Sequence, residues 1–177
     1  MLFPTIALIF VINSLELELK YGPNIPMSNL NRNYQTTSAI SSALNFNNFQ
    51  LAYGFAKLPN KINRQEYINW HEIALVYHYP FIKKERNSML ASFGANYNYF
   101  LRRMLSVEEK TYAFGIKYGL GYKQKFTGGD FVDKIRPALL ARVYLNQVIQ
   151  ARDWNYNQIM TSEFFLLLSL GISFQIL

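Results

Sequence analysis

The sequence has no cysteine among its 177 residues and only two histidines. The absence of cysteine excludes a disulfide framework, a thiolate zinc site, an iron–sulfur cluster and a cysteine nucleophile. Long hydrophobic runs are also missing, because no segment reaches the roughly 18 apolar residues that a membrane-spanning helix needs. Charged residues make up only 16% of the chain, so the net charge of +7 does not indicate a disordered polybasic protein. The length predicts a single domain.

A compact apolar segment, Leu2–Ile12, begins the chain and is followed by Asn13 and Ser14. This pattern is typical of the apolar region of a short secretory signal peptide. We therefore expect residues 1–14 to be a signal peptide and residues 15–177 to be the mature domain. A buried first strand or helix of the mature fold is the alternative, because no Lys or Arg precedes the apolar segment.

From Leu15 onward, apolar side chains recur at every second position, which places them on one face of a β-strand. Residues 112–123 show the pattern most clearly, because Tyr, Phe, Ile and Leu alternate there with Ala, Gly and Lys. The predicted strands are residues 15–21, 39–46, 49–56, 71–79, 89–99, 112–123, 134–145 and 164–176. Their length fits a tilted strand that crosses a bilayer, which needs about 9 to 11 residues.

The two faces of these strands differ in residue size. The apolar face carries Phe, Tyr, Leu and Ile, whereas the opposite face is mostly Gly, Ala and Ser with scattered charges. Because the interior of a closed eight-stranded barrel is just wide enough for side chains, the small face fits inside and the bulky face fits outside, against lipid. The sequence therefore predicts an all-β protein, an eight-stranded antiparallel up-and-down transmembrane β-barrel. A soluble lipocalin-like ligand-binding barrel, with its apolar face inward, is the lesser alternative. Tyrosines at strand ends suit the two membrane interfaces: Tyr21, Tyr79, Tyr99, Tyr112 and Tyr122.

In this pattern the chain from Leu15 to Leu177 resembles the small OmpA/OmpX-type outer-membrane β-barrels, the outer membrane protein beta-barrel domain family. The expected long connections are residues 23–36, 59–68, 102–110 and 148–158. The expected shorter ones are residues 47–48, 80–87 and 126–131. The resemblance implies a bacterial outer-membrane location, long connections outside the cell and both termini in the periplasm. It also implies insertion by the barrel-assembly machinery, and we expect a monomer.

The chain has few candidate catalytic residues. Barrels of similar size include lipid A deacylases and acyltransferases, which need a histidine that acts with a serine. Neither His71 nor His78 is followed by such a serine, since Ile73 and Pro80 stand two residues later. Two histidines on opposite faces of one strand cannot converge on a metal ion. We therefore expect no enzymatic activity, no metal site and no cofactor.

Charged residues on the small-residue face are expected to fill the lumen as ion pairs, because eight strands leave little space for water. The predicted lumen charge network is Glu16, Glu18, Glu72, Lys117, Lys123, Lys134, Arg136, Arg142 and Glu163. Near the end that holds the termini we expect one group: Glu16 and Glu18 with Lys123, Lys134 and Arg136. Towards the other end we expect a second: Arg142 with Glu163, and Glu72 and Lys117 across the lumen.

Basic residues of the predicted loops are candidate contacts for lipopolysaccharide phosphates: Arg64, Arg102, Arg103 and Arg152. A solvated rim that only keeps the loops soluble is the alternative. We expect no nucleic-acid binding, because the basic residues are scattered over loops and turns. The expected function is a non-enzymatic integral outer-membrane barrel that contacts membrane lipid and uses its extracellular loops for surface or lipopolysaccharide interaction. A narrow pore or transport barrel is the alternative.

Overall fold

The computed structural model describes residues 14–27, 29–63, 65–104, 107–153, 158–160 and 163–176. The predicted signal peptide, apart from Ser14, lies outside the described residues. Among the residues described, no helix combines the length and the hydropathy that crossing a bilayer requires.

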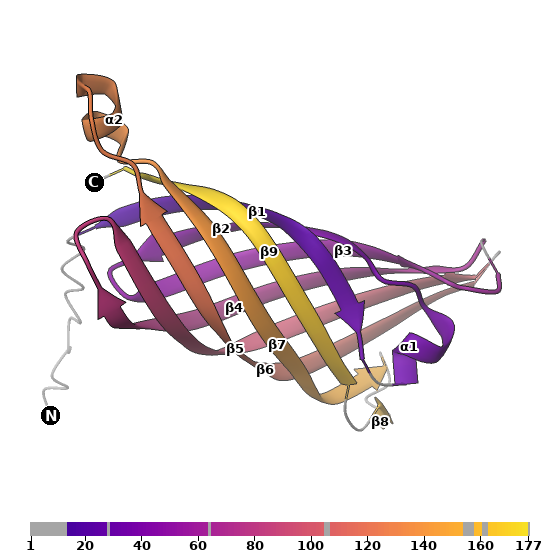
Figure 1. Cartoon of the computed structure of the whole chain (residues 1–177). Helices are drawn as coiled ribbons and strands as arrows, with labels where there is room; N and C mark the ends of the chain where they lie inside the picture. Colours follow the sequence, from indigo (N-terminus) through magenta and orange to yellow (C-terminus); the bar gives the residue numbers. More distant parts are fainter. Residues whose placement is uncertain are drawn as a thin grey trace, which may run out of the picture.

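The strands form one antiparallel sheet that closes into a barrel (Figure 1). The eight barrel strands are β1 (Leu15–Pro26), β2 (Thr37–Phe46), β3 (Phe49–Pro59), β4 (Tyr67–Lys83), β5 (Asn87–Met104), β6 (Val107–Lys125), β7 (Ala138–Asp153) and β9 (Glu163–Gln175). Pairing of β1 with β9 closes the sheet, and the short strand β8 (Gln158–Met160) pairs with the end of β7. Two short helices lie in connections: α1 (Asn29–Asn33) and α2 (Asp130–Ile135). The predicted all-β, up-and-down, eight-stranded barrel is confirmed.

The bulky apolar face points outward, as predicted. Phe93 and Leu120 on this face are 64% and 58% exposed, whereas Ala74 and Ala113 on the opposite face are 1% exposed. On β4 the outward residues of the apolar belt run from His71 to Phe81. About ten residues of a strand tilted by about 40° span roughly 25 Å along the barrel axis. This is the height of the lipid-facing band of outer-membrane barrels, about 25 Å.

The strands are staggered around the barrel. Following the register of Tyr21 through β2, β3, β4 and β5 leads to Tyr112 on β6. Following it the other way, through β9 and β7, leads to Tyr122, so the two paths differ by ten residues. Such a stagger goes with strands tilted by about 35–45°. Residues that meet across the lumen are therefore not those that face each other along one hydrogen-bonded row.

Strands β5 and β6 extend well beyond their predicted ends. A charged loop was predicted at residues 102–110, but pairing continues to Met104 and Val107, so this prediction is wrong. Opposite charges on neighbouring strands stabilise the ladder beyond the apolar belt, where the apolar alternation is no longer needed. Two such pairs are in register: Arg102 with Glu109, and Arg103 with Glu108.

Two further predicted connections are also partly strand. Strand β4 continues into the predicted turn 80–87 as far as Lys83, with a register shift between Pro80 and Ile82, because proline cannot donate to the ladder. Strand β7 continues into the predicted loop 148–158 as far as Asp153. Both strands are longer than the apolar alternation indicated.

Helix α2 replaces the first part of the predicted strand 134–145. The chain enters the helix through Gly128 and Gly129, whose φ angles of 116° and 89° suit residues without a side chain. Arg136 ends the helix in a left-handed conformation with φ 42°, and Pro137 cannot continue it. The connection predicted at 126–131 is therefore longer, from 126 to 137.

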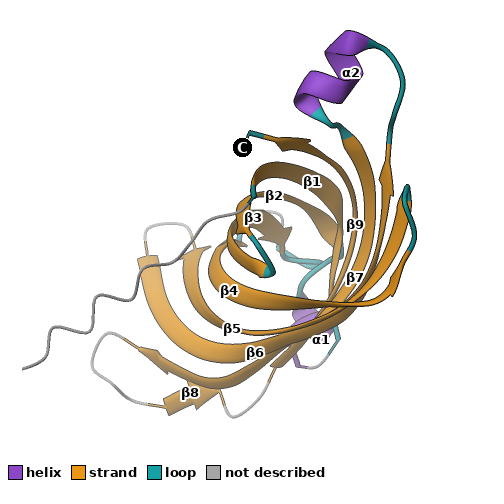
Figure 2. Ribbon diagram, turned by 90° about the vertical axis from the view of Figure 1, so that its left-hand side faces the viewer, coloured by secondary structure: helices purple, strands orange, loops and turns teal. Residues whose placement is uncertain are grey.

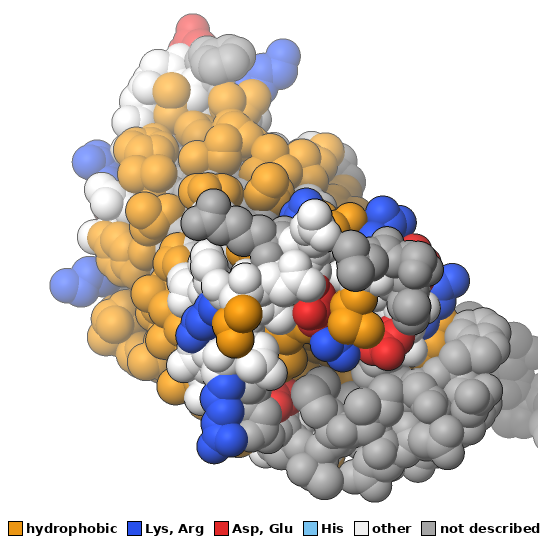
Figure 3. All heavy atoms as spheres, turned by 90° about the vertical axis from the view of Figure 1, so that its right-hand side faces the viewer, with side chains coloured by type: hydrophobic (Ala, Val, Ile, Leu, Met, Phe, Trp, Pro, Cys, Tyr) orange, Lys and Arg blue, Asp and Glu red, His pale blue; other side chains and the backbone are white. Residues whose placement is uncertain are grey.

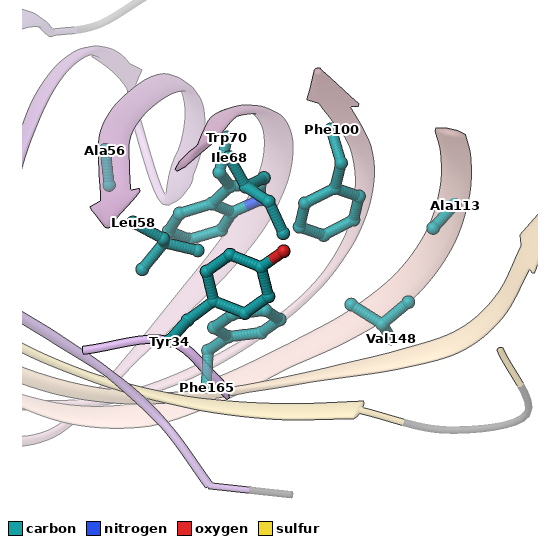
Figure 4. Packing of buried hydrophobic residues seen from close by; sticks show 9 residues of the cluster. All are labelled: Tyr34, Ala56, Leu58, Ile68, Trp70, Phe100, Ala113, Val148 and Phe165. Atoms are coloured by element: carbon teal, nitrogen blue, oxygen red, sulfur yellow. The ribbon is translucent and has the colours of Figure 1, made fainter. Parts of the chain in front are cut away.

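A cluster of buried apolar side chains closes the lumen near α1 (Figure 4). It consists of Tyr34, Ala56, Leu58, Ile68, Trp70, Phe100, Ala113, Val148 and Phe165, here called the apolar plug. The rings of Trp70 and Phe165 stack with centroids 5.2 Å apart, and both residues are 0% exposed. The Trp70 Nε1–H donates to Asn98 Oδ1 at 2.8 Å, so its polar atom is satisfied.

Candidate functional site

Directly below the apolar plug, the lumen holds a carboxylate surrounded by donors. Glu72 pairs with Lys117, with Nζ 2.5 Å from Oε2. Its other oxygen accepts hydrogen bonds from the side-chain amides of Asn96 at 2.7 Å and Asn146 at 2.8 Å. These residues are buried, and the Glu72–Lys117 pair that the sequence analysis placed in the lumen does lie there.

A second polar layer surrounds Glu18 in the middle of the lumen. Arg142 Nη2 lies 2.5 Å from Glu18 Oε1, and Lys20 Nζ lies 3.2 Å from Glu18 Oε2. Gln50 Nε2 donates to Oε2 at 2.7 Å, and Arg142 Nη1 donates to the Tyr144 hydroxyl at 2.8 Å. All five residues are buried, so two cations share one carboxylate and all three charges are largely removed from solvent.

Tyr144 fits into this layer because Gly119 faces it on β6. A Cβ atom at Gly119 would lie 2.7 Å from Tyr144 Cδ1, closer than van der Waals contact allows. Lys117 Nζ lies 4.9 Å from the centre of the Tyr144 ring, so the ring face also contacts a cation. The glycines of β6 therefore leave room for the polar side chains of β7.

His78 is part of the same layer, and its hydrogen bonds determine its tautomer. Its Nε2 lies 3.1 Å from Arg142 Nη1, and its Nδ1 lies 2.8 Å from Ser92 Oγ. Because a guanidinium only donates, Nε2 must accept, and the proton of the neutral ring sits on Nδ1 and points to Ser92. His78 therefore cannot take a proton from Ser92.

At the α2 end of the lumen, Glu16 forms an ion pair with Lys123, as expected. The prediction is wrong for Lys134, which is exposed on α2. Arg136 at the end of that helix lies at the mouth of the barrel, where it lines a small pocket with Glu16 and Lys123 and donates to the Gln175 side chain at 3.3 Å. Neither residue forms an ion pair with a described lumen carboxylate, because the chain forms α2 where a strand was predicted.

The predicted pairing of Arg142 with Glu163 is also wrong. Arg142 pairs with Glu18, while Glu163 is fully buried near α1 and accepts a weak hydrogen bond from the Leu30 backbone N–H at 3.4 Å. The two residues are on neighbouring strands, but Arg142 is in register with Ser169 and Glu163 with Val148. They are thus separated by about half the height of the barrel.

A polar cluster above the apolar plug ties two connections to the paired ends of β5 and β6. The Tyr34 hydroxyl donates to Glu66 Oε1 at 2.6 Å, and Arg102 Nε donates to the same oxygen at 2.8 Å. Arg102 also pairs with Glu109 at 3.3 Å. We call Tyr34, Glu66, Arg102 and Glu109 the loop latch. Arg102, predicted to contact lipopolysaccharide, is thus engaged within the protein.

The loop latch shifts two ionisation equilibria. Burial alone would raise the pKa of Glu66, but hydrogen bonds from Tyr34 and Arg102, together with the Arg102 charge, hold it below its usual 4.5. Burial, and then the bond to Glu66, raises the pKa of Tyr34 to about 12. Both shifts favour the ionised carboxylate and the neutral phenol that the geometry requires.

Acid is expected to loosen the loop latch. Because the Glu66 pKa is lower in the folded state, its contribution to stability is complete above about pH 4.5 and is lost as the pH falls through the folded-state pKa. Because Arg102 is partly exposed, we expect protonation of Glu66 to weaken the loop latch by about 1 kcal/mol. Hydrogen-exchange protection of the Gln35 and Lys61 backbone amides, which bond across these connections, should then fall roughly fivefold. Exchange measured at pH 6 and pH 3, corrected for intrinsic rates, tests this. The Glu66→Gln variant should show little change between these two pH values, and equal pH dependence in parent and variant would contradict the assignment.

Arg103 lies on the opposite, outward face of β5. Its guanidinium lies 3.3 Å from Glu108 and 3.3 Å from the Tyr67 hydroxyl. Lys110 Nζ lies 3.9 Å from the same Glu108, and Lys57 Nζ lies 3.9 Å from the centre of the Tyr67 ring. Figure 3 shows charged side chains around this end and hydrophobic ones on the adjoining wall. Of the other two candidates, Arg152 is in register with Tyr112 on the described backbone, and Arg64 lies outside the described residues.

Aromatic side chains mark the edge of the apolar belt below these cations. Tyr99 and Tyr112 contact each other with ring centroids 5.2 Å apart, and the His71 ring lies 5.8 Å from Tyr99. The Tyr53 hydroxyl lies 2.7 Å from His71 Nδ1. His71 therefore belongs to an interfacial aromatic cluster. Lys57 was not among the predicted candidates, and only the structure places its ammonium over the Tyr67 ring.

Together, the outward apolar belt, the aromatic edge and the filled lumen define a small membrane-spanning β-barrel. Within the described part of the chain, no group of three or more His, Asp or Glu side chains is arranged to hold a metal ion. No protein-family model and no curated protein sequence matches the chain.

Solved structures of outer-membrane barrels match the whole fold. Neisserial surface protein A (NspA) superposes with a TM-score of 0.63 and 12% identity, over 90% of this chain and 96% of that one. A major outer membrane protein of Thermus thermophilus gives a TM-score of 0.55 and 13% identity, over 92% and 98%. The N-terminal barrel of Pseudomonas aeruginosa OprF gives 0.50 and 14%, over 93% and 98%. The chain thus has the fold of small bacterial outer-membrane barrels, and its outward apolar belt is that of a membrane-spanning barrel.

Proposed function

We propose that this protein is a non-enzymatic integral barrel whose outward cations beyond the apolar belt bind lipopolysaccharide at the membrane surface. One observation carries the proposal: Lys57, Arg103 and Lys110 project from the barrel wall just past the aromatic edge of the belt. A barrel residue at this height meets lipid headgroups, and lipopolysaccharide carries phosphates there.

The register gives the spacing between the belt and the cations. Tyr99 faces Tyr112 at the edge of the belt, and the next outward pair is Leu101 with Lys110. Arg103 and Glu108 follow two residues further on. Each two-residue step along a tilted strand rises about 5 Å, so the ammonium and guanidinium groups lie within about 10 Å of the aromatic rings.

The charge balance of this surface favours an anion. Arg103 and Lys110 share a single carboxylate, Glu108, and Lys57 rests on an uncharged ring. The three cations thus exceed the one anion that contacts them among the described residues. The alternative, a solvated rim without a ligand, predicts no dependence of lipid association on these side chains.

The described side chains give no support to catalysis. His71 contacts Tyr53 at the lipid interface, and the hydrogen bond from Arg142 fixes His78 in the tautomer that donates to Ser92. Neither histidine can act as a general base toward a serine in this arrangement. The lumen side chains around Glu72 and Glu18 are held by ion pairs and amide hydrogen bonds.

The double change Arg103→Ser with Lys110→Ser is expected to weaken lipopolysaccharide association. Each cation near an anionic surface contributes about 1 kcal/mol, and Glu108 already offsets one of the two, so we expect about fivefold weaker association at 50 mM salt. The difference should shrink at 500 mM salt because exposed charges are screened. Binding of labelled lipopolysaccharide to the protein in phosphatidylcholine nanodiscs measures this effect.

Two controls separate a specific contact from general charge. The pair Arg86→Ser with Lys134→Ser removes two exposed cations at the opposite end and should leave the association unchanged. Arg102→Ser should loosen the loop latch but have little effect on association, since Arg102 is paired with Glu66 and Glu109. Equal losses in all variants, or no change at either salt concentration, would favour the solvated rim.

A further inference from the structure

The end of the barrel that carries α2 and the C-terminus faces the viewer in Figure 2. Here the structure has a cavity of about 480 Å³, within the range of small-ligand sites. Glu18, Asn45, His78 and Arg142 line its inner part, and the turn of β4 and β5 together with the end of β6 line its rim. We propose that this cavity binds a small phosphate-bearing anion.

The rim of the cavity is basic. Lys83, Lys84 and Lys125 line it, and Glu85 is the one acidic residue among the described rim residues. The turn and the end of β6 are held together, since the Lys125 backbone N–H donates to the Arg86 carbonyl at 2.7 Å. Lys84 and Lys125 therefore approach the opening from adjacent segments. Within the described part of the chain, none of these three lysines forms an ion pair.

The inner part of the cavity is balanced in charge, and the positive excess comes from the rim. Glu16 is paired with Lys123, and Glu18 is paired with Arg142, so two carboxylates face two cations there. With the three rim lysines and Glu85, the described lining of the cavity carries five cations and three carboxylates. In a concave site with low-dielectric walls such an excess attracts an anion more strongly than it would at an open surface.

Two buried donors at the cavity make no hydrogen bond of good geometry among the described residues: Arg142 Nε and Asn45 Nδ2, the latter beside Glu18. Arg142 is 4% exposed and Asn45 is 6% exposed, and both line the cavity. A buried donor without a partner is costly, and an acceptor-rich ligand would satisfy both. Asn87 Oδ1 is likewise unpartnered and suits a protonated phosphate oxygen.

The donor set favours phosphate over carboxylate. Arg142 Nη1 donates to Tyr144 and Nη2 donates to Glu18, so these two nitrogens are not available to bind a planar carboxylate ligand in a bidentate way. The remaining groups are ammonium ions and single N–H donors, which bind the tetrahedral phosphate group as point charges. The Glu18 layer and the apolar plug close the lumen deeper in, so the cavity is a blind pocket. It lies at the end opposite the proposed lipopolysaccharide cations and does not depend on them.

Calorimetric titration of the full chain in phosphatidylcholine nanodiscs tests the proposal, with pyrophosphate and glycerol 3-phosphate as separate probes. The parent should bind with 1:1 saturation, more weakly at higher sodium chloride. The variant Lys84→Ser with Lys125→Ser should bind about tenfold more weakly, from two exposed charges worth up to about 0.7 kcal/mol each. The control Lys57→Ser with Lys110→Ser removes two cations at the other end and should bind like the parent.

Asn45→Asp probes the inner part of the cavity, because it replaces the unpartnered donor by a carboxylate oxygen. It should abolish binding, and the Asn45 side-chain amide of the parent should shift in NMR spectra on titration. Binding of pyrophosphate alone would support a free phosphate ligand, and binding of both probes would support one that includes a lipid headgroup. Absence of saturable binding, equal weakening in the control, or unchanged binding in a folded Asn45→Asp protein would overturn the proposal. Should Asn45→Asp not fold, the rim variant decides.

Discussion

Arginine in place of Leu120 or Leu168 is expected to prevent most of the protein from folding into lipid. Both residues lie on the outward face of the apolar belt, Leu168 near the middle of β9 and Leu120 in register with it through Val143, and Leu120 is 58% exposed. An arginine near the bilayer midplane costs about 2 to 4 kcal/mol, a large part of the stability of a small barrel. The folded fraction in phosphatidylcholine vesicles, measured by heat-modifiable gel mobility and urea unfolding, should fall sharply for each variant.

Asn69→Arg is the matched control for these changes. Asn69 is on the outward face of β4 but lies beyond His71, where the wall already carries Lys57 in register. An arginine there should cost little, because depth in the bilayer sets the penalty. Folding of both leucine variants as efficiently as the parent would show that the belt does not face lipid.

Removal of either Arg142 or Glu18 is expected to destabilise the barrel by about 3 to 5 kcal/mol, because the remaining charge stays buried. The double variant Arg142→Met with Glu18→Gln should lose clearly less than the sum of the two single variants. Urea unfolding of all four proteins in vesicles gives the coupling energy. Lys20 remains next to Glu18 and will reduce the coupling but not abolish it.

The cycle of Arg142→Met with Glu163→Gln is the control, and it should be additive. Glu163 lies near α1 and contacts the Leu30 N–H rather than Arg142. A large coupling with Glu163, or strict additivity with Glu18, would contradict the observed pairing. The same layer predicts that the parent passes no steady current across a planar bilayer. An ohmic conductance would instead support the pore alternative.

The sequence by itself determined the architecture and the face that meets lipid. Period-two alternation is a local property, and the size difference between the faces decides which one fits the narrow interior. The number of strands, the outward apolar face and the tight turn at Asn47 and Asn48 followed from these patterns. The presence of Glu72, Lys117 and Arg142 in the lumen followed as well, since each alternates with outward residues.

Strand ends beyond the membrane were not predictable in the same way. In water a strand needs no apolar alternation, so the extensions of β5 and β6 carry charges that looked like a loop. Helix α2 has only six residues, too few to show a helical period.

The tertiary structure alone decided which charges meet inside the barrel. The register shifts by ten residues around the eight strands, so each row of hydrogen-bonded neighbours climbs along the barrel axis. The position of a lumen residue in the sequence therefore does not specify its height in the barrel. Arg142 consequently meets Glu18, which is 124 residues away, rather than Glu163 on the neighbouring strand. Only the structure shows that residues 102 and 103 belong to a strand, and since adjacent residues of a strand point to opposite faces, Arg102 enters the loop latch while Arg103 faces outward.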